Sequence, residues 1–163
     1  MFERLLLAID DSPASELATL FANAAARRTG AAVRVLHVNE YLVGGRGVTL
    51  LTHDESDALV DGAVKELHDA GVPADGVSVV ATYRQVPQCI VEAARDYEAD
   101  AIVLGSNRHR WMSRLFSPQV RERTTRLTSL PILTAPAPLR VTAAGMRHAV
   151  QAQVDAEIAS FRG

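Results

Sequence analysis

The segment RLLLAIDDSP, from Arg4 to Pro13, contains the change from strand to helix that decides the fold. Its apolar residues, Leu5 to Ile9, are consecutive rather than alternating, which is typical of a strand buried on both faces. Ser12 and Pro13 then mark a helix start, because serine is a favoured N-cap residue and proline fits the first helical position. A buried strand that leads directly into a helix predicts a parallel sheet with crossover helices.

The same alternation of apolar runs and helical patterns continues to residue 135. The predicted strands are 4–9, 32–38, 77–83, 100–105 and 131–135. The predicted helices are 13–30, 52–70, 87–97 and 119–127, the second of which begins with a capping box at Thr52 and Glu55. With right-handed crossovers, this order predicts an α/β fold with a doubly wound, five-stranded parallel sheet.

The chain changes character after Ala135. The stretch PAPLR, 136–140, resembles an extended linker, because proline disfavours helix at and before its own position. A last helix is predicted from Thr142 to Phe161, with Met146, Val150, Val154, Ile158 and Phe161 on one broad face. We expect this helix to dock on its own domain or on a partner subunit. The predicted division is a domain at 1–136, followed by a linker and a C-terminal helix at 137–163.

Composition favours an ordinary globular domain. Of 163 residues, 48% are hydrophobic and 22% charged, as in typical soluble proteins. No apolar run approaches the ~20 residues of a transmembrane helix, and the first residues lack a secretory signal, so a cytoplasmic protein is expected. The net charge of −2 argues against general nucleic-acid binding, and the single Cys89 excludes an internal disulfide.

Positive charge is nevertheless concentrated in residues 108–126, which contain six arginines and a single acidic residue, Glu122. They are Arg108, Arg110, Arg114, Arg121, Arg123 and Arg126. Within this basic loop, the segment RHRWMSRLF (108–116) also carries Trp111, Met112, Leu115 and Phe116. These apolar residues either cover a crevice or an interface, or contact an anionic membrane or a protein partner.

Catalytic and metal-binding patterns are absent from the sequence. The five histidines do not have the i, i+3 or i, i+4 spacing that a helical metal site uses. No nucleophile-elbow, Walker or dinucleotide-binding glycine motif is present. The sequence therefore predicts no catalytic residue and no metal ligand, and a protein that is not an enzyme.

Three polar or glycine-containing segments follow predicted strands, where ligands bind in open parallel sheets. They are Asp10-Asp11-Ser12, Val38-Asn39-Glu40 and Gly105-Ser106-Asn107. We expect them to converge on one crevice, in which an acidic side chain accepts hydrogen bonds from a ribose or an adenine. For Asp11 and Ser12 the structural role at a helix N-terminus is favoured over ligand binding, whereas Asp10 precedes the cap and is open to either role.

These segments resemble those of the universal stress protein family over residues 3–136. The matching stretches are LLLAIDDSPAS, VLHV, EADAIVLGSN and SLPILTAP. The resemblance implies an adenine-nucleotide alpha-hydrolase-like α/β fold, and homodimers paired through the last strand, Pro131–Ala135. It also implies a role in stress tolerance and regulation without known catalysis.

Family members that bind ATP carry the motif G-x2-G-x9-G-[S/T] after the fourth strand. Laid on this sequence from Gly105, the second glycine falls on Arg108, the third on Pro118 and the hydroxyl residue on Gln119. The resemblance assigns the adenosine end of a ligand to Asp10 and Val38. The nucleotide-binding residues it implies are Asp10, Val38, Gly105, Ser106, Asn107, Arg108, Gln119 and Val120.

The lost glycines weaken the phosphate half of this site. A glycine-rich loop binds phosphate through several closely placed N–H groups, which side chains obstruct and which proline lacks. Arg108 could replace part of this binding through a charge-assisted contact. Weak or absent ATP binding is therefore expected, with ATP, AMP or another adenine nucleotide as the ligand if one binds. The alternatives are a nucleotide-independent signalling or scaffold module, acting through the basic loop and the C-terminal helix, and a nucleotide hydrolase or transferase.

Overall fold

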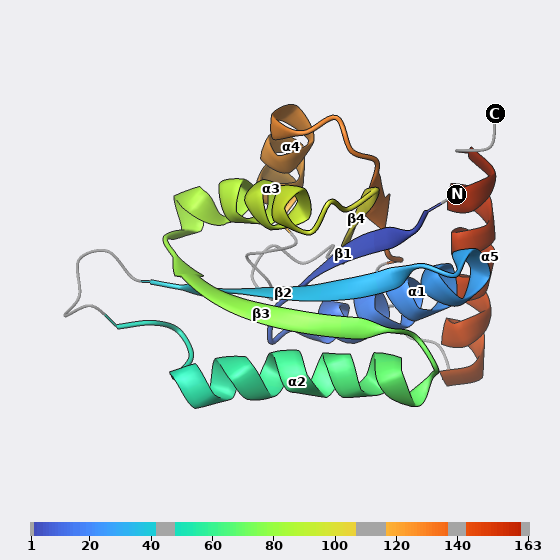
Figure 1. The fold of residues 1–163 in the computed structure, drawn as a ribbon, viewed down its shortest axis with the longest axis horizontal. Helices are drawn as coiled ribbons and strands as arrows, with labels where there is room; N and C mark the ends of the chain where they lie inside the picture. The colour runs from blue at the N-terminus through green and yellow to red at the C-terminus, as the bar shows by residue number, and fades with distance from the viewer. Residues whose placement is uncertain (1, 42–47, 107–116, 137–142, 161–163) are drawn as a thin grey trace.

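The computed structural model of the protein describes residues 2–41, 48–106, 117–136 and 143–160. One parallel sheet runs through its centre in the order β3-β2-β1-β4-β5 (Figure 1). Its strands are β1 (Arg4–Ile9), β2 (Ala32–Glu40), β3 (Ala74–Ala81), β4 (Ala101–Leu104) and β5 (Ile132–Thr134). The predicted five-stranded parallel sheet is confirmed, and its strand order reverses between β1 and β4.

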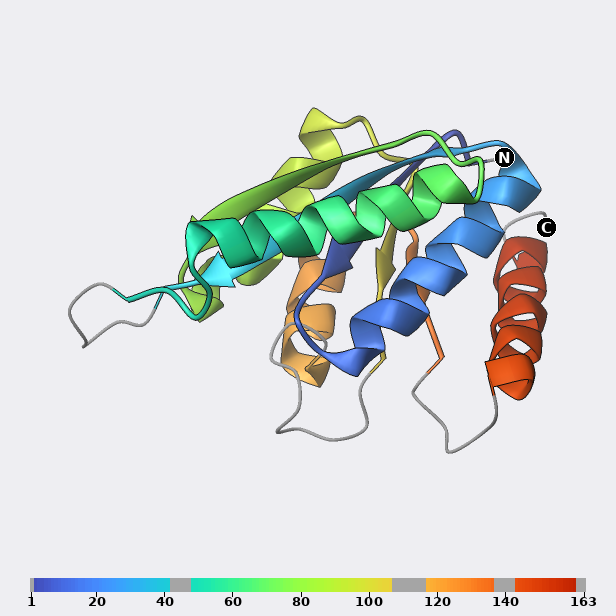
Figure 2. The ribbon, with the colours of Figure 1, turned by 90° about the horizontal axis from the view of Figure 1, so that it is seen from below.

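Helices cover both faces of the sheet. On one side are α1 (Pro13–Thr29), α2 (His53–Asp69) and α5 (Ala143–Ser160), and on the other are α3 (Val86–Asp96) and α4 (Pro118–Leu127) (Figures 1 and 2). Between β3 and α3, Tyr83–Gln85 form a single 3-10 turn. This layering buries β1 and β4 on both faces, and Leu5, Leu6, Leu7, Ile102 and Leu104 are completely inaccessible to solvent.

Local sequence signals explain where α1 and α2 begin and end. Pro13 occupies the first turn of α1, and Gly30 ends the helix with a φ of 81°, a conformation that favours glycine. The capping box predicted for α2 is present, because the Thr52 hydroxyl accepts a hydrogen bond from the Glu55 N–H and the Glu55 carboxylate accepts one from the Thr52 N–H.

Several predicted strand ends are wrong by two or three residues. β2 continues to Glu40 instead of ending at Val38, because its pairing with β3 extends through Asn39 and Glu40, the latter opposite Ala81. β3 begins at Ala74 rather than Val77, and it ends before the 3-10 turn, which Thr82 caps through its contacts with Gln85. Predicted β4 and β5 shorten to Ala101–Leu104 and Ile132–Thr134.

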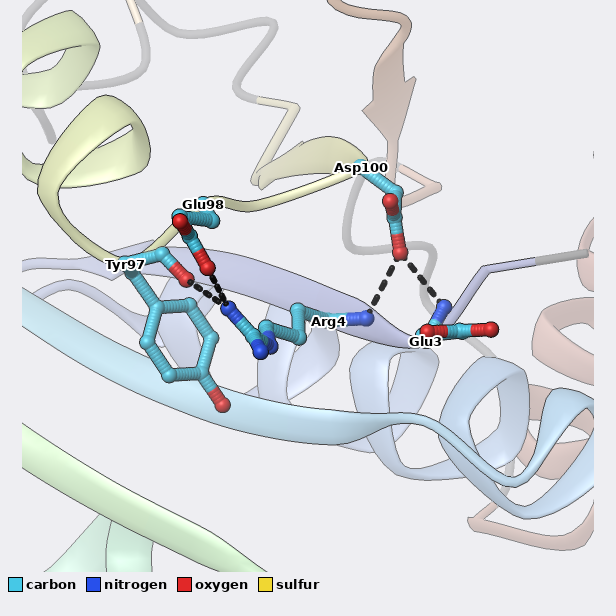
Figure 3. A network of polar contacts seen from close by, with 5 residues as sticks. All are labelled: Glu3, Arg4, Tyr97, Glu98 and Asp100. Carbon is cyan, nitrogen blue, oxygen red and sulfur yellow. Dashed lines mark hydrogen bonds and ion pairs between the residues drawn. The ribbon is translucent and has the colours of Figure 1, made fainter.

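A polar network closes the amino end of the sheet, opposite the predicted site (Figure 3). The Asp100 carboxylate accepts hydrogen bonds from the backbone N–H groups of Glu3 and Arg4, the latter at 2.8 Å. The Arg4 guanidinium pairs with Glu98 and also donates to the Tyr97 carbonyl. These contacts hold the start of β1 against the turn between α3 and β4.

The C-terminal helix docks on its own domain. Val150, Val154 and Ile158 recur every four residues and are 3%, 0% and 6% exposed. Asp155 forms an ion pair with Arg28 of α1 at 2.9 Å. The first of the two predicted docking modes is therefore confirmed, while the linker and Phe161 lie outside the described residues.

Candidate functional site

Strand register brings the predicted site residues to one level at the carboxyl edge of the sheet. The register pairs are Ile9 with His37 and Leu7 with Val103. Asp10 and Val38 each follow a paired residue by one position, and Ser106 stands as far beyond Val103 as Asp10 stands beyond Leu7. Asp10, Val38 and Ser106 therefore meet where the strand order reverses, which is the usual ligand position in such sheets. We call this region the edge crevice.

Asp10 is held rigidly at the end of β1. Its Oδ1 atom accepts hydrogen bonds from the Ser12 N–H at 2.9 Å, from the Ser12 hydroxyl and from the Ser15 hydroxyl at 2.9 Å. The Asp10 N–H in turn donates to the Ser15 hydroxyl at 2.7 Å. The half-buried carboxylate is thus fixed in one orientation.

The expected capping role of the Ser12 side chain is wrong, although Ser12 is the N-cap residue of α1. Its side chain makes no capping bond to the helix and donates to Asp10 instead. The hydrogen bond to the ionised carboxylate is stronger than one between neutral groups, which favours a side-chain orientation of Ser12 toward Asp10. Asp11 is exposed.

Val38 presents its backbone toward the crevice side of β2. The N–H of Ala32 bonds to Glu3, beside β1, whereas the N–H of Val33 bonds to Pro73, beside β3. Because backbone groups alternate along a strand, the even-numbered Val38 faces β1, which ends at this level. The next residue, Asn39, is used structurally, since its side-chain amide makes two hydrogen bonds with the backbone of Leu51.

On the other side of the crevice, β4 leads into Gly105 and Ser106. Gly105 is buried and Ser106 is half-buried, and the Ala135 N–H donates to the Leu104 carbonyl just before them at 2.8 Å. Asn107 and Arg108, together with the apolar residues of 108–116, lie outside the described residues. Their expected roles stay predictions.

The first turn of α4 supplies the remaining predicted residues. Ser117 is the N-cap, and its hydroxyl accepts a hydrogen bond from the Val120 N–H at 3.3 Å and contacts the Tyr83 hydroxyl at 3.1 Å. The Arg121 N–H donates to the Ser117 carbonyl. Pro118 has no N–H group. Among the described residues, the Gln119 N–H is therefore the one backbone donor in this turn that has no hydrogen-bond partner. The Gln119 side chain is exposed, whereas Val120 is buried.

The described residues include few side chains arranged for catalysis or metal binding. They contain no group of three His, Cys, Asp or Glu residues that could hold a metal ion. Burial raises the pKa of the half-buried Cys89 thiol, which keeps it protonated and a poor nucleophile. The buried His37 donates from Nδ1 to the Ile9 carbonyl at 3.0 Å, because a carbonyl can only accept.

Two residues that contact the candidate site were missed by sequence reasoning. Ser15 fixes Asp10 across one turn of α1, and Ser117 caps α4. A signal for Ser117 exists, because Ser117-Pro118 repeats the Ser-Pro pattern that predicts the start of α1. No local pattern indicates that Ser15 bonds to Asp10, since that contact depends on how the strand enters the helix.

No helix within the described ranges is long and apolar enough to cross a membrane. A comparison with curated proteins finds no match. Solved structures do match. A universal stress protein family member from Burkholderia pseudomallei is 23% identical, with a TM-score of 0.66, over 83% of this chain and 96% of the other.

Two further structures contain nucleotides. The universal stress protein from Archaeoglobus fulgidus in complex with dAMP is 23% identical, with a TM-score of 0.63, over 82% of this chain and 98% of the other. A family protein from Arabidopsis thaliana with AMP bound is 15% identical, with a TM-score of 0.59, over 88% and 98% of the two chains. At these identities the likeness shows the fold. The sequence model of the universal stress protein family matches residues 1–136, and the chain therefore belongs to that family.

Proposed function

We propose that this chain is a non-enzymatic, cytoplasmic regulatory protein that binds an adenine nucleotide in the edge crevice, with the adenosine part held firmly and the phosphates held weakly. Asp10 and Val38 contact the adenosine end. Gly105, Ser106, Gln119 and Val120 are proposed for the phosphate half of the site, together with Asn107 and Arg108, which lie outside the described residues. Membership of the family supports this role, as do the relatives that hold dAMP and AMP.

The first turn of α4 is the observation that carries the proposal. A helix N-terminus binds phosphate through its unbonded N–H groups. Here Pro118 has none, the Val120 N–H is bonded to the Ser117 hydroxyl, and the Arg121 N–H is bonded to the Ser117 carbonyl. Gln119 thus offers a single backbone donor. One donor cannot distinguish strongly between one phosphate and three.

Two substitutions test this directly. In calorimetric titrations, the unmodified chain is expected to bind AMP and ATP with affinities within about tenfold of each other. The double variant Pro118→Gly, Gln119→Ser restores a bare N–H and a hydroxyl, and each added charge-assisted bond contributes about 1.5–3 kcal/mol. ATP affinity should therefore rise about tenfold or more, and AMP affinity should change much less.

A matched control separates the effect of the added N–H group from the effect of the space that glycine opens over the backbone. Pro118→Ala, Gln119→Ser also adds an N–H but keeps a Cβ atom over the backbone, so its gain in ATP affinity should be smaller. Much tighter binding of ATP than of AMP to the unmodified chain would refute the weak phosphate site. If no adenine nucleotide binds at about 1 mM, the crevice proposal itself is wrong.

We also propose that two copies pair through the edge strand β5. A groove of about 540 Å³ runs beside this strand and is lined by Ile132, Thr134 and Leu130 together with Arg121 and Thr125 of α4. Ile132 and Thr134 are half-buried in the single chain. An edge strand with a neighbouring groove is a natural place for a second copy to add its own strand.

A further inference from the structure

A second groove lies between α1 and α5, which contact each other and cross at an angle (Figures 1 and 2). It has a volume of about 410 Å³, and Leu20, Ala24 and Val150 form its apolar floor. This volume falls within the range of small-molecule sites, about 300–1,000 Å³. The groove is separate from the edge crevice, because α1 starts there at Pro13 and reaches Arg27 roughly 21 Å further along its axis. We call it the α1–α5 groove.

Positive charge is concentrated around the α1–α5 groove. Arg27 and Arg28 from the last turn of α1 and Arg147 from α5 line it. Asp155 neutralises Arg28, but neither Arg27 nor Arg147 forms an ion pair with any described residue. Two unpaired guanidinium groups thus border one small cavity, and such groups bind phosphate and carboxylate oxygens in pairs of parallel hydrogen bonds.

Two side-chain amides also line the groove, those of Asn23 and Gln151. An amide offers both a hydrogen-bond donor and an acceptor, so it suits a ligand that carries hydroxyl groups.

We propose that the α1–α5 groove binds a phosphate monoester of a small hydroxylated molecule, such as a sugar phosphate. The phosphate contacts Arg27 and Arg147, hydroxyl groups bond to the side-chain amides of Asn23 and Gln151, and the apolar face of the molecule lies on Leu20 and Val150. Because the ligand touches both helices, its binding strengthens the attachment of α5 to α1. The adenine nucleotide in the edge crevice is not required.

Calorimetric titration of the full chain tests this, with ribose 5-phosphate, inorganic phosphate and ribose as probes. Ribose 5-phosphate should bind most tightly, inorganic phosphate more weakly and ribose least. The double variant Arg27→Gln, Arg147→Gln should lose about tenfold or more in affinity for ribose 5-phosphate. Asn23→Ala should weaken ribose 5-phosphate binding and leave inorganic phosphate binding nearly unchanged.

Two controls locate the binding site. Arg95→Gln removes an exposed arginine from α3 and should leave binding intact. Asp10→Ala alters the edge crevice, so loss of ribose 5-phosphate binding in this variant alone would move the ligand there and overturn the proposal. Unchanged affinity in Arg27→Gln, Arg147→Gln overturns it as well, as does the absence of binding at about 10 mM. Hydrogen exchange in α5 should slow when ribose 5-phosphate is added, and unaltered exchange would contradict a ligand between the two helices.

Discussion

Arg34 shows how one side chain joins two strands and a helix at the residue scale. Its Nε atom donates to Asp75 Oδ1 at 2.7 Å, and its second nitrogen pairs with the other carboxylate oxygen. The guanidinium also lies 4.4 Å from the centre of the Tyr97 ring, at the end of α3. The hydrogen bond from Arg34 lowers the pKa of Asp75 below its usual 3.8, and the nearby positive charge acts in the same direction.

This pKa shift predicts how the stability of the protein depends on pH. A carboxyl whose pKa is lower in the folded state stabilises that state above its unfolded pKa, and the contribution disappears as the pH falls through the folded pKa. In urea unfolding at pH 7, Asp75→Asn should cost less than about 1 kcal/mol, because the pair is largely exposed. The difference between the two proteins should vanish in acid. Asp61→Asn, an exposed control on α2, should show little change at either pH, and an Asp75→Asn effect that persists in strong acid would contradict the ion-pair origin.

At the element scale, the packing of α2 on β3 explains both a success and a failure of sequence reasoning. The capping box at Thr52 predicts the start of α2, because all its contacts lie within four residues. The start of β3 was missed, because Ala74, Asp75 and Gly76 belong to residue types that are uncommon in strands. They become strand by pairing with β2, and Gly76 fits because Val60 of α2 approaches it so closely that an added Cβ would lie 2.2 Å from Val60 Cγ1.

Two glycine substitutions on these elements should have opposite effects on stability. Gly76→Ala forces the stiff Val60 side chain or the whole helix to move, and overpacking of this kind typically costs about 1–3 kcal/mol. Gly62→Ala, in the exposed part of α2, meets nothing within 4 Å and should stabilise the protein by up to about 1 kcal/mol through helix propensity. Thermal unfolding of both variants measures this, and equal effects would show that β3 and α2 are not closely packed.

At the scale of the whole molecule, sequence patterns predict the sheet and the meeting of Asp10, Val38 and Ser106 at its edge, because strand order alone brings these residues together. They do not predict which donors near the crevice are already bonded. The capping of α4 by Ser117 and the hydrogen bond from the Ser15 hydroxyl to Asp10 depend on side-chain geometry after folding. The α1–α5 groove was missed for a related reason, since it exists only once α5 has docked.

The docking of α5 also bears on assembly, because Gln153 donates from its side chain to the Thr134 carbonyl of β5 at 2.7 Å. A second copy that pairs with β5 would compete for this acceptor, so Gln153→Ala should tighten the proposed dimer.

Ile132→Lys places a charge on the half-buried edge strand and should weaken the dimer at least about tenfold. Light scattering over a dilution series measures both effects, with circular dichroism to confirm folding. Val80→Lys, at a 63% exposed position on the opposite edge strand β3, should remain as dimeric as the unmodified chain. Dissociation by Val80→Lys and not by Ile132→Lys would move the interface from β5 to β3.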